Sequence, residues 1–166
     1  MANATLKHLF IEEMRDTYSS ETQVLQNFGT MAAAATSPKL KQVFQAHERE
    51  SRTHLERLTR AFDHLLTSPE GNTCEATQGL LAEVKEVLGE GMPKELLDVA
   101  LVMGAQKIEH YEIASYGSLK AIAESCSLDP IATLLGETLE EEKAQDAKLT
   151  QLAESDVNKA AAAAAR

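Results

Sequence analysis

The sequence predicts an all-α protein, a bundle of four long helices arranged as two helical hairpins. Apolar residues recur at helical spacing through four long stretches, and clusters of Pro, Gly and Ser separate those stretches. Aromatic residues make up only 4% of the chain and Trp is absent, so the core must consist mainly of aliphatic side chains. At 166 residues the chain has the size of one domain, and we expect residues 1–166 to form it.

The first hairpin is predicted from helices at 4–34 and 38–66. Ser37 and Pro38 separate them, and serine is favoured just before a helix while proline is favoured in its first turn. Such a short link joins antiparallel neighbours, so the two helices should pack side by side. The turn-forming residues from Pro69 onward end the second helix.

A shorter helix at 75–89 is predicted in the connection between the hairpins. A helix of roughly 28 residues is about 42 Å long, and the connection must cover nearly that distance before the next long helix begins. The apolar side of the short helix should therefore pack along the bundle. That side consists of Leu80, Leu81, Val84, Val87 and Leu88.

The second hairpin is predicted from helices at 93–125 and 129–156. Pro93 marks the start of the first, and the short link before Pro130 again predicts antiparallel packing. The segment 158–166 contains six consecutive alanines without apolar periodicity, so we expect it to be a frayed helical end.

Each long stretch carries acidic residues within its own apolar stripe. An isolated buried carboxylate costs roughly several kcal/mol even after relaxation, so acids on all four helices are not expected to be buried without a partner. A shared cation would satisfy them together. The candidate metal ligands are Glu21, Glu50, His54, Glu109, Glu112, Glu142 and Asp146.

Depth along the bundle supports this convergence. Glu21 and Glu50 stand nearly equally far from the first hairpin turn, on opposite sides of it. Glu112 and Glu142 do the same at the second turn, and Glu109 lies about one helical turn further away. The acids should therefore meet near one level, and both Glu109 and Glu112 are candidates.

The donor atoms indicate which metal to expect. Carboxylates with one or two imidazoles suit iron or manganese, whereas a structural zinc site would more often offer thiolates. In di-metal carboxylate bundles two helices each supply a Glu, and the other two each supply a Glu with a following His. We therefore expect two iron ions, with manganese as the alternative.

Charge and composition exclude several classes of protein. The formal net charge of -10 argues against nonspecific nucleic-acid binding, which depends on Lys and Arg. No apolar stretch is long enough to cross a bilayer, and no secretory signal is evident at the start. Two cysteines without metal spacing, Cys74 and Cys126, are expected to be reduced, so we expect a cytoplasmic protein without a membrane partner.

Several motifs together resemble the YciE/YciF-like bacterial stress proteins of the ferritin-like superfamily, over about residues 5–158. The motifs are Asp16 to Glu21, His47 with Glu50, Gln106 to Gly117, and Glu137 to Lys143. The resemblance implies a ferritin-like four-helix fold, a homodimer, a di-metal centre and an association with stress. It does not imply a settled biochemical activity.

The wider superfamily implies roles for individual residues. Glu50 and Glu142 would bridge the metals, Glu21 and Glu109 would be terminal ligands, and His54 would cap one metal. The sequence departs from the usual Glu-x-x-His pattern, because His54 follows Glu50 by four residues and Asp146 stands four residues after Glu142. Residues four apart still share a helix face, so coordination is feasible, with two unequal metal positions.

The sequence leaves two interpretations open for each of four other polar residues. Glu112 is either a ligand or an acceptor that supports one, and His47 either packs beside the site or competes with His54. Tyr18 and Tyr116 either bond a ligand carboxylate or relay an electron, or are core tyrosines with satisfied hydroxyls. The remaining histidines, expected at the surface, are His8, His64 and His110.

Two functions fit these expectations. In the first, the metal pair oxidises Fe(II) or removes peroxide, with peroxide or oxygen as the small oxidant. A built-in rubredoxin module is excluded because the chain lacks the four cysteines it needs, so any reductant would come from elsewhere. In the second, the protein is a noncatalytic stress protein, with a metal-stabilised or metal-free bundle.

Overall fold

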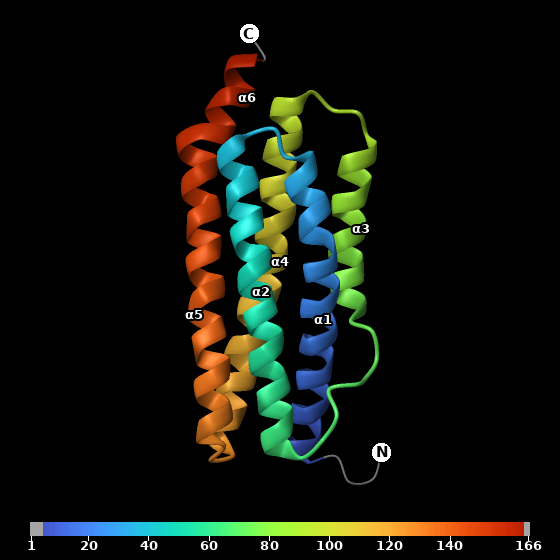
Figure 1. Ribbon diagram of the computed structural model, residues 1–166, viewed down its shortest axis with the longest axis vertical. Coiled ribbons are helices and arrows are strands. Elements are labelled where there is room, and N and C mark those ends of the chain that lie inside the picture. Colours follow the sequence, from blue (N-terminus) through green and yellow to red (C-terminus); the bar gives the residue numbers. More distant parts are fainter. Residues whose placement is uncertain (1–4, 165–166) are drawn as a thin grey trace.

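The predicted all-α bundle is confirmed by the computed structural model, which describes residues 5–164. Four long helices lie side by side with a shorter one along their flank, and no strand occurs within the described range (Figure 1). In chain order the elements are α1 (Leu6–Ala34), α2 (Pro38–Leu65), α3 (Glu75–Gly89), α4 (Lys94–Ser125), α5 (Asp129–Leu152), η1 (Ala153–Val157) and α6 (Asn158–Ala164).

The turn between α1 and α2 shows why the helices end where the sequence predicts. The Ser37 hydroxyl accepts a hydrogen bond from the Leu40 amide, and Pro38 occupies the first turn of α2. The buried carboxylate of Asp98 on α4 accepts bonds from the Thr36 and Ser37 amides at 2.7 and 2.8 Å. These contacts fasten the turn to the second hairpin.

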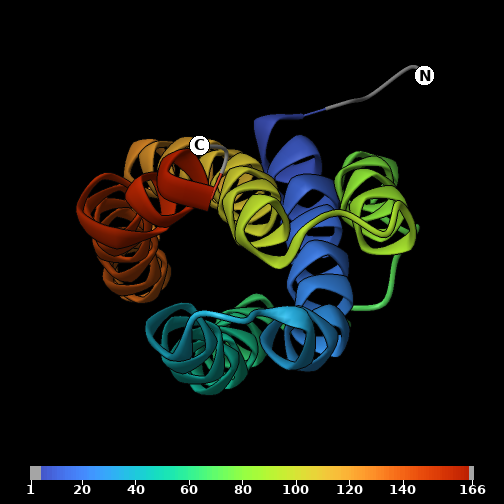
Figure 2. The same cartoon turned by 90° about the horizontal axis from the view of Figure 1, so that it is seen from above.

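The four long helices form a closed ring of neighbours. Seen from above, α1 packs against α2 and α4, and α5 completes the ring by packing against the same two helices (Figure 2). The crossover helix α3 lies outside this ring, against α1 and α4. The ring therefore encloses one central axis to which all four helices present a face.

The core divides into two apolar clusters, one near each end of the bundle. The cluster near the α1–α2 turn includes Val24, Phe28, Leu40, Phe44, Leu101, Ala105 and Leu149. The cluster near the α4–α5 turn includes Phe10, Met14, Leu58, Phe62, Leu119, Ile131 and Leu135. Between them, at mid-height, the inward positions are polar.

The two ends of the chain need separate description. α5 gives way to a π-helical turn, and α6 continues to Ala164 with Ala161 buried, in the segment expected to fray. Residue 4, where the first helix was expected to begin, and residues 165–166 of the expected tail lie outside the described residues. Within residues 5–164, every helix is too short or too polar to cross a bilayer.

Candidate metal centre

A layer of buried acids and imidazoles occupies the middle of the bundle, and each long helix contributes to it. Every one of these side chains is at most 1% exposed. They are Glu21 on α1, His47 and His54 on α2, Glu109 and Glu112 on α4, and Glu142 on α5. Ionisable groups this deeply buried are rare unless they are paired or bind metal.

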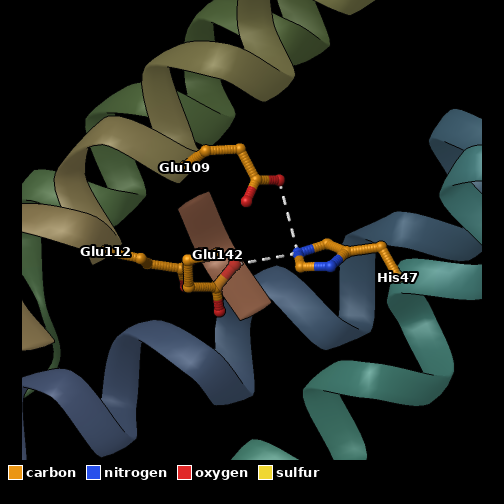
Figure 3. Close-up of side chains that lie close together, drawn as sticks. All are labelled: His47, Glu109, Glu112 and Glu142. Atoms are coloured by element: carbon orange, nitrogen blue, oxygen red, sulfur yellow. Dashed lines mark ion pairs between the residues drawn. The ribbon is translucent and has the colours of Figure 1, made fainter. Parts of the chain in front are cut away.

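The first group in this layer gathers three acids around one imidazole. Nε2 of His47 lies 3.3 Å from an oxygen of Glu109 and 3.5 Å from an oxygen of Glu142 (Figure 3). Glu112 projects from α4 toward the same point. One donor atom from each of these four residues lies within 4.8 Å of all the others.

The second group lies beside the first and shares one residue with it. Nδ1 of His54 lies 2.8 Å from Oε1 of Glu142 and 3.2 Å from Oε1 of Glu21, and the three residues again offer donor atoms within 4.8 Å of one another. Glu142 belongs to both groups. Its two oxygens face different imidazoles, one in each group.

Most side-chain oxygens and nitrogens that could bind a metal in this layer have no hydrogen-bond partner within the protein. Both carboxylate oxygens of Glu109, Glu112 and Glu142 are unsatisfied. The same holds for Oε2 of Glu21, Nε2 of His47 and Nδ1 of His54, because even the 2.8 Å approach to Glu142 lacks hydrogen-bond geometry. Buried polar groups are nearly always bonded, so this concentration of orphaned donor atoms points to a ligand.

Burial and neighbouring charges shift the pKa values of several residues in this layer. Burial and the neighbouring acids raise the pKa of Glu109 and of Glu112 well above the usual value. Burial alone would lower the pKa of His54, but Glu142 and Glu21 outweigh it and raise that pKa to about 11. His54 is therefore an imidazolium that partly neutralises the acids around it.

Two charged residues at the edge of the bundle orient His54. Its Nε2 lies 2.9 Å from Oε2 of Glu141, and Arg57 donates two hydrogen bonds to the same carboxylate at 2.6 and 2.8 Å. The Arg57 bonds lower the pKa of Glu141, which therefore stays an anion. Because Nε2–H is committed to Glu141, Nδ1 is the nitrogen that faces the carboxylates.

The structure shows different environments for Tyr116 and Tyr18. Tyr116 is fully buried and donates a 2.7 Å hydrogen bond to Oε1 of Glu21, so it supports a candidate ligand. Tyr18 is half-buried and packs edge-on against Phe62 with 6.2 Å between ring centroids, as a core tyrosine would.

The donor set fits a pair of hard or borderline cations. An ion held at about 2.1 Å separates opposite ligand atoms by about 4 Å, so small side-chain rotations would close either group around one. Carboxylate oxygens and imidazole nitrogens without any thiolate suit iron and manganese. The first group offers four residues and the second offers three, so the two positions are unequal.

Two predicted ligands stand outside both groups. The Glu50 side chain is 36% exposed, and its oxygens lie 3.5 Å from Nδ1 of His47 and 3.8 Å from the Lys148 ammonium. Asp146 is 21% exposed and accepts a 3.0 Å hydrogen bond from Gln106. As observed, each points toward the rim of the bundle.

Four residues in or beside this layer were not among the predicted ligands. His47, for which the sequence left two interpretations open, stands in the first group. Ser51 and Gln145 were not singled out and Glu141 appeared only within the motif Glu137 to Lys143, yet the first two are buried and the third lies 2.9 Å from Nε2 of His54. Three-residue spacing from His54 and Glu142 could have identified Ser51 and Gln145. His8, His64 and His110 are exposed, as expected.

Comparisons with known proteins agree with this fold. A family model described as a domain of unknown function, DUF892, matches residues 5–162. The chain is 44% identical over 163 residues to protein YciF of Escherichia coli strain K12, with 95% of each covered. The crystal structure of that stress protein superposes with a TM-score of 0.91 and 42% identity, covering 95% of this chain and 99% of the other.

Two other solved structures extend the comparison. YcfI of Rhodopseudomonas palustris, described as a candidate structural protein, has a TM-score of 0.86 and 39% identity, covering 89% of this chain and 94% of its own. Symerythrin of Cyanophora paradoxa has a TM-score of 0.62 and 14% identity, covering 93% of this chain and 86% of its own. The likeness to symerythrin concerns the fold alone.

Proposed function

The chain belongs to the DUF892 family, and from this premise and its buried polar layer we propose that it binds two iron or manganese ions and reacts them with a small oxidant. One observation carries the proposal: unsatisfied acids and imidazoles from four helices converge in two groups that share Glu142. The ions would supply Lewis acidity and reducing electrons. The association with stress rests on the likeness to E. coli YciF, which is a stress protein.

The proposed ligands divide between the two groups. His47, Glu109 and Glu112 would hold one ion, Glu21 and His54 would hold the other, and Glu142 would bridge them. Glu50 and Asp146 remain predicted ligands that would have to rotate inward from the rim.

Elemental analysis of protein purified from its native host tests the metal content directly. We expect about two Fe or Mn per chain, because two groups of donor atoms are present. Glu142→Ala should lose most of this metal, while Glu56→Ala, on the exposed side of α2, should keep it. A metal-free native protein would refute the proposal.

Stopped-flow mixing tests turnover. Peroxide should oxidise Fe(II) bound to the protein faster than it oxidises free Fe(II) in the same buffer. A rate no greater than that of free iron would favour the second candidate, a noncatalytic bundle. Two apolar clusters that pack the ends of the bundle independently of the polar layer support that alternative.

The predicted homodimer stays a prediction that light scattering can test.

A further inference from the structure

Two neutral polar residues stand beside the candidate metal centre on the side where α2 and α5 meet. Ser51 on α2 and Gln145 on α5 are each only 1% exposed. The Ser51 hydroxyl and both polar atoms of the Gln145 amide have no hydrogen-bond partner within the protein. An apolar side chain would avoid the desolvation cost of these groups, so their presence requires an explanation.

The contacts between α2 and α5 place Ser51 and Gln145 at one level. On one side of them, His54 of α2 meets Glu141 of α5. On the other side, Glu50 of α2 lies 3.8 Å from Lys148 of α5. Because the helices are antiparallel neighbours, the intervening residues Ser51 and Gln145 must stand opposite one another between these pairs.

The spacing of these residues relates them to the metal-binding pattern of carboxylate bundles. That pattern has a Glu followed three residues later by a His on each of two helices. Here Ser51 precedes His54 by three residues, and Gln145 follows Glu142 by three. Each helix therefore keeps one strong ligand and has a neutral, weakly coordinating group at the other position, so ions bound here would have fewer protein ligands on this side and could accept an external molecule.

We propose that Ser51 and Gln145 form a binding position for hydrogen peroxide next to the two metal ions. The inference rests on the proposed function and names its oxidant. A hydroxyl and an amide each donate and accept hydrogen bonds, which matches a molecule with two O–H groups and free lone pairs. Dioxygen has no proton to donate, so the same pair would hold it poorly. His54 lies three residues after Ser51 and Glu142 three residues before Gln145, so each is the helical neighbour of one member of the pair and an oxidant held there would lie close to the second group.

The redox step balances with the reduced metal ions as the electron source. Hydrogen peroxide, two divalent ions and two protons give two trivalent ions and two molecules of water. The O–O bond would break, the bound ions would supply one electron each, and each peroxide oxygen would gain one electron and one proton. Ser51 and Gln145 bind and orient the oxidant and are not themselves oxidised.

Three variants of the full chain test the position. Gln145→Leu and Ser51→Ala remove its hydrogen bonds, and Gln151→Leu is the matched control because Gln151 is exposed on the same helix. Each protein is loaded with Fe(II) without oxygen and mixed with a series of peroxide concentrations. We expect Gln145→Leu to lower the second-order rate constant about tenfold or more, Ser51→Ala to lower it by about threefold to tenfold, and the control to leave it unchanged.

Four further measurements separate peroxide binding from a structural or ligand role. Metal affinity and content should stay within about threefold of the parent in both variants, and metal-free Gln145→Leu should unfold at the same temperature as the parent or higher. The rate with dioxygen should be unchanged.

Each contrary outcome overturns a distinct statement. Equal peroxide rates in the parent and both variants would overturn the position alone, while a parent without metal would remove the proposed function and this inference with it. Loss of metal from Gln145→Leu would make the amide a ligand instead. Equal losses of rate with peroxide and dioxygen would overturn the preference for peroxide.

Discussion

Replacing Glu112 with leucine should stabilise the metal-free protein. Glu112 is 1% exposed and neither of its carboxylate oxygens has a hydrogen-bond partner, while burial raises its pKa. Leucine is similar in size and carries no polar atoms, so Glu112→Leu removes the desolvation cost of an unsatisfied group, about 1–3 kcal/mol. For a domain of this size that gain corresponds to an increase of about 2–12 °C in Tm.

The same substitution should weaken metal binding. Glu112 is one of four residues around the first candidate ion position, and loss of its carboxylate should lower affinity there about tenfold or more. Ligand binding stabilises the folded state in proportion to the logarithm of the ratio of free ligand to Kd. Added metal should therefore stabilise Glu112→Leu less than it stabilises the parent, so the variant's advantage shrinks or reverses.

Urea unfolding followed by circular dichroism, first with a chelator and then with excess Mn(II), measures both effects. Glu56→Leu is the control, because Glu56 is exposed on α2 and its loss should alter neither condition appreciably. Metal-free Glu112→Leu that unfolds more easily than the parent would refute the reasoning about buried, unsatisfied carboxylates. An unchanged response to Mn(II) would remove Glu112 from the ligand set.

Three more predictions concern neighbouring residues. Glu142→Ala should lose both ions by elemental analysis while Glu50→Ala keeps at least one, and equal losses would place Glu50 among the ligands. The unfolding free energy of the metal-free protein should fall between about pH 6 and 10, because folded His54 keeps its proton toward a pKa of about 11 while an unfolded histidine releases it near 6.5. Urea midpoints that stay flat or rise with pH would contradict this. Arg57→Ala should weaken metal binding about tenfold in calorimetry by freeing Glu141 from its fixed position, and unchanged affinity would exclude that role.

Local signals were sufficient to predict the fold. Ser37 and Pro38 begin α2 by capping and by fixed backbone geometry, and these effects act within a few residues. Pro130 likewise fixes the backbone in the first turn of α5, although no side chain caps that helix. The π-helical turn at Ala153–Val157 was not predicted, because it interrupts a helix without any proline or glycine to mark it.

Helical periodicity predicted which face of each helix points inward, and so identified most of the candidate ligands. It did not predict which residues at the margins of each face are buried. His47 and His54 are seven residues apart, nearly two full turns, so both point inward. Glu50 lies on the opposite margin of that stripe from Ser51, and tertiary packing exposes the first and buries the second. A four-residue and a three-residue spacing are equally good on an isolated helix, so only the contact with α5 decides between them.

The division of the core into two apolar clusters has a consequence for how the protein is made. Each cluster draws side chains from all four long helices, so the hydrophobic driving force for assembly resides at both extremities of the molecule. Under the proposed function, a newly synthesised chain would fold through these clusters before it binds metal and would take up the proposed ions afterwards. The proposed ions would then bind and dissociate repeatedly without unfolding of the chain.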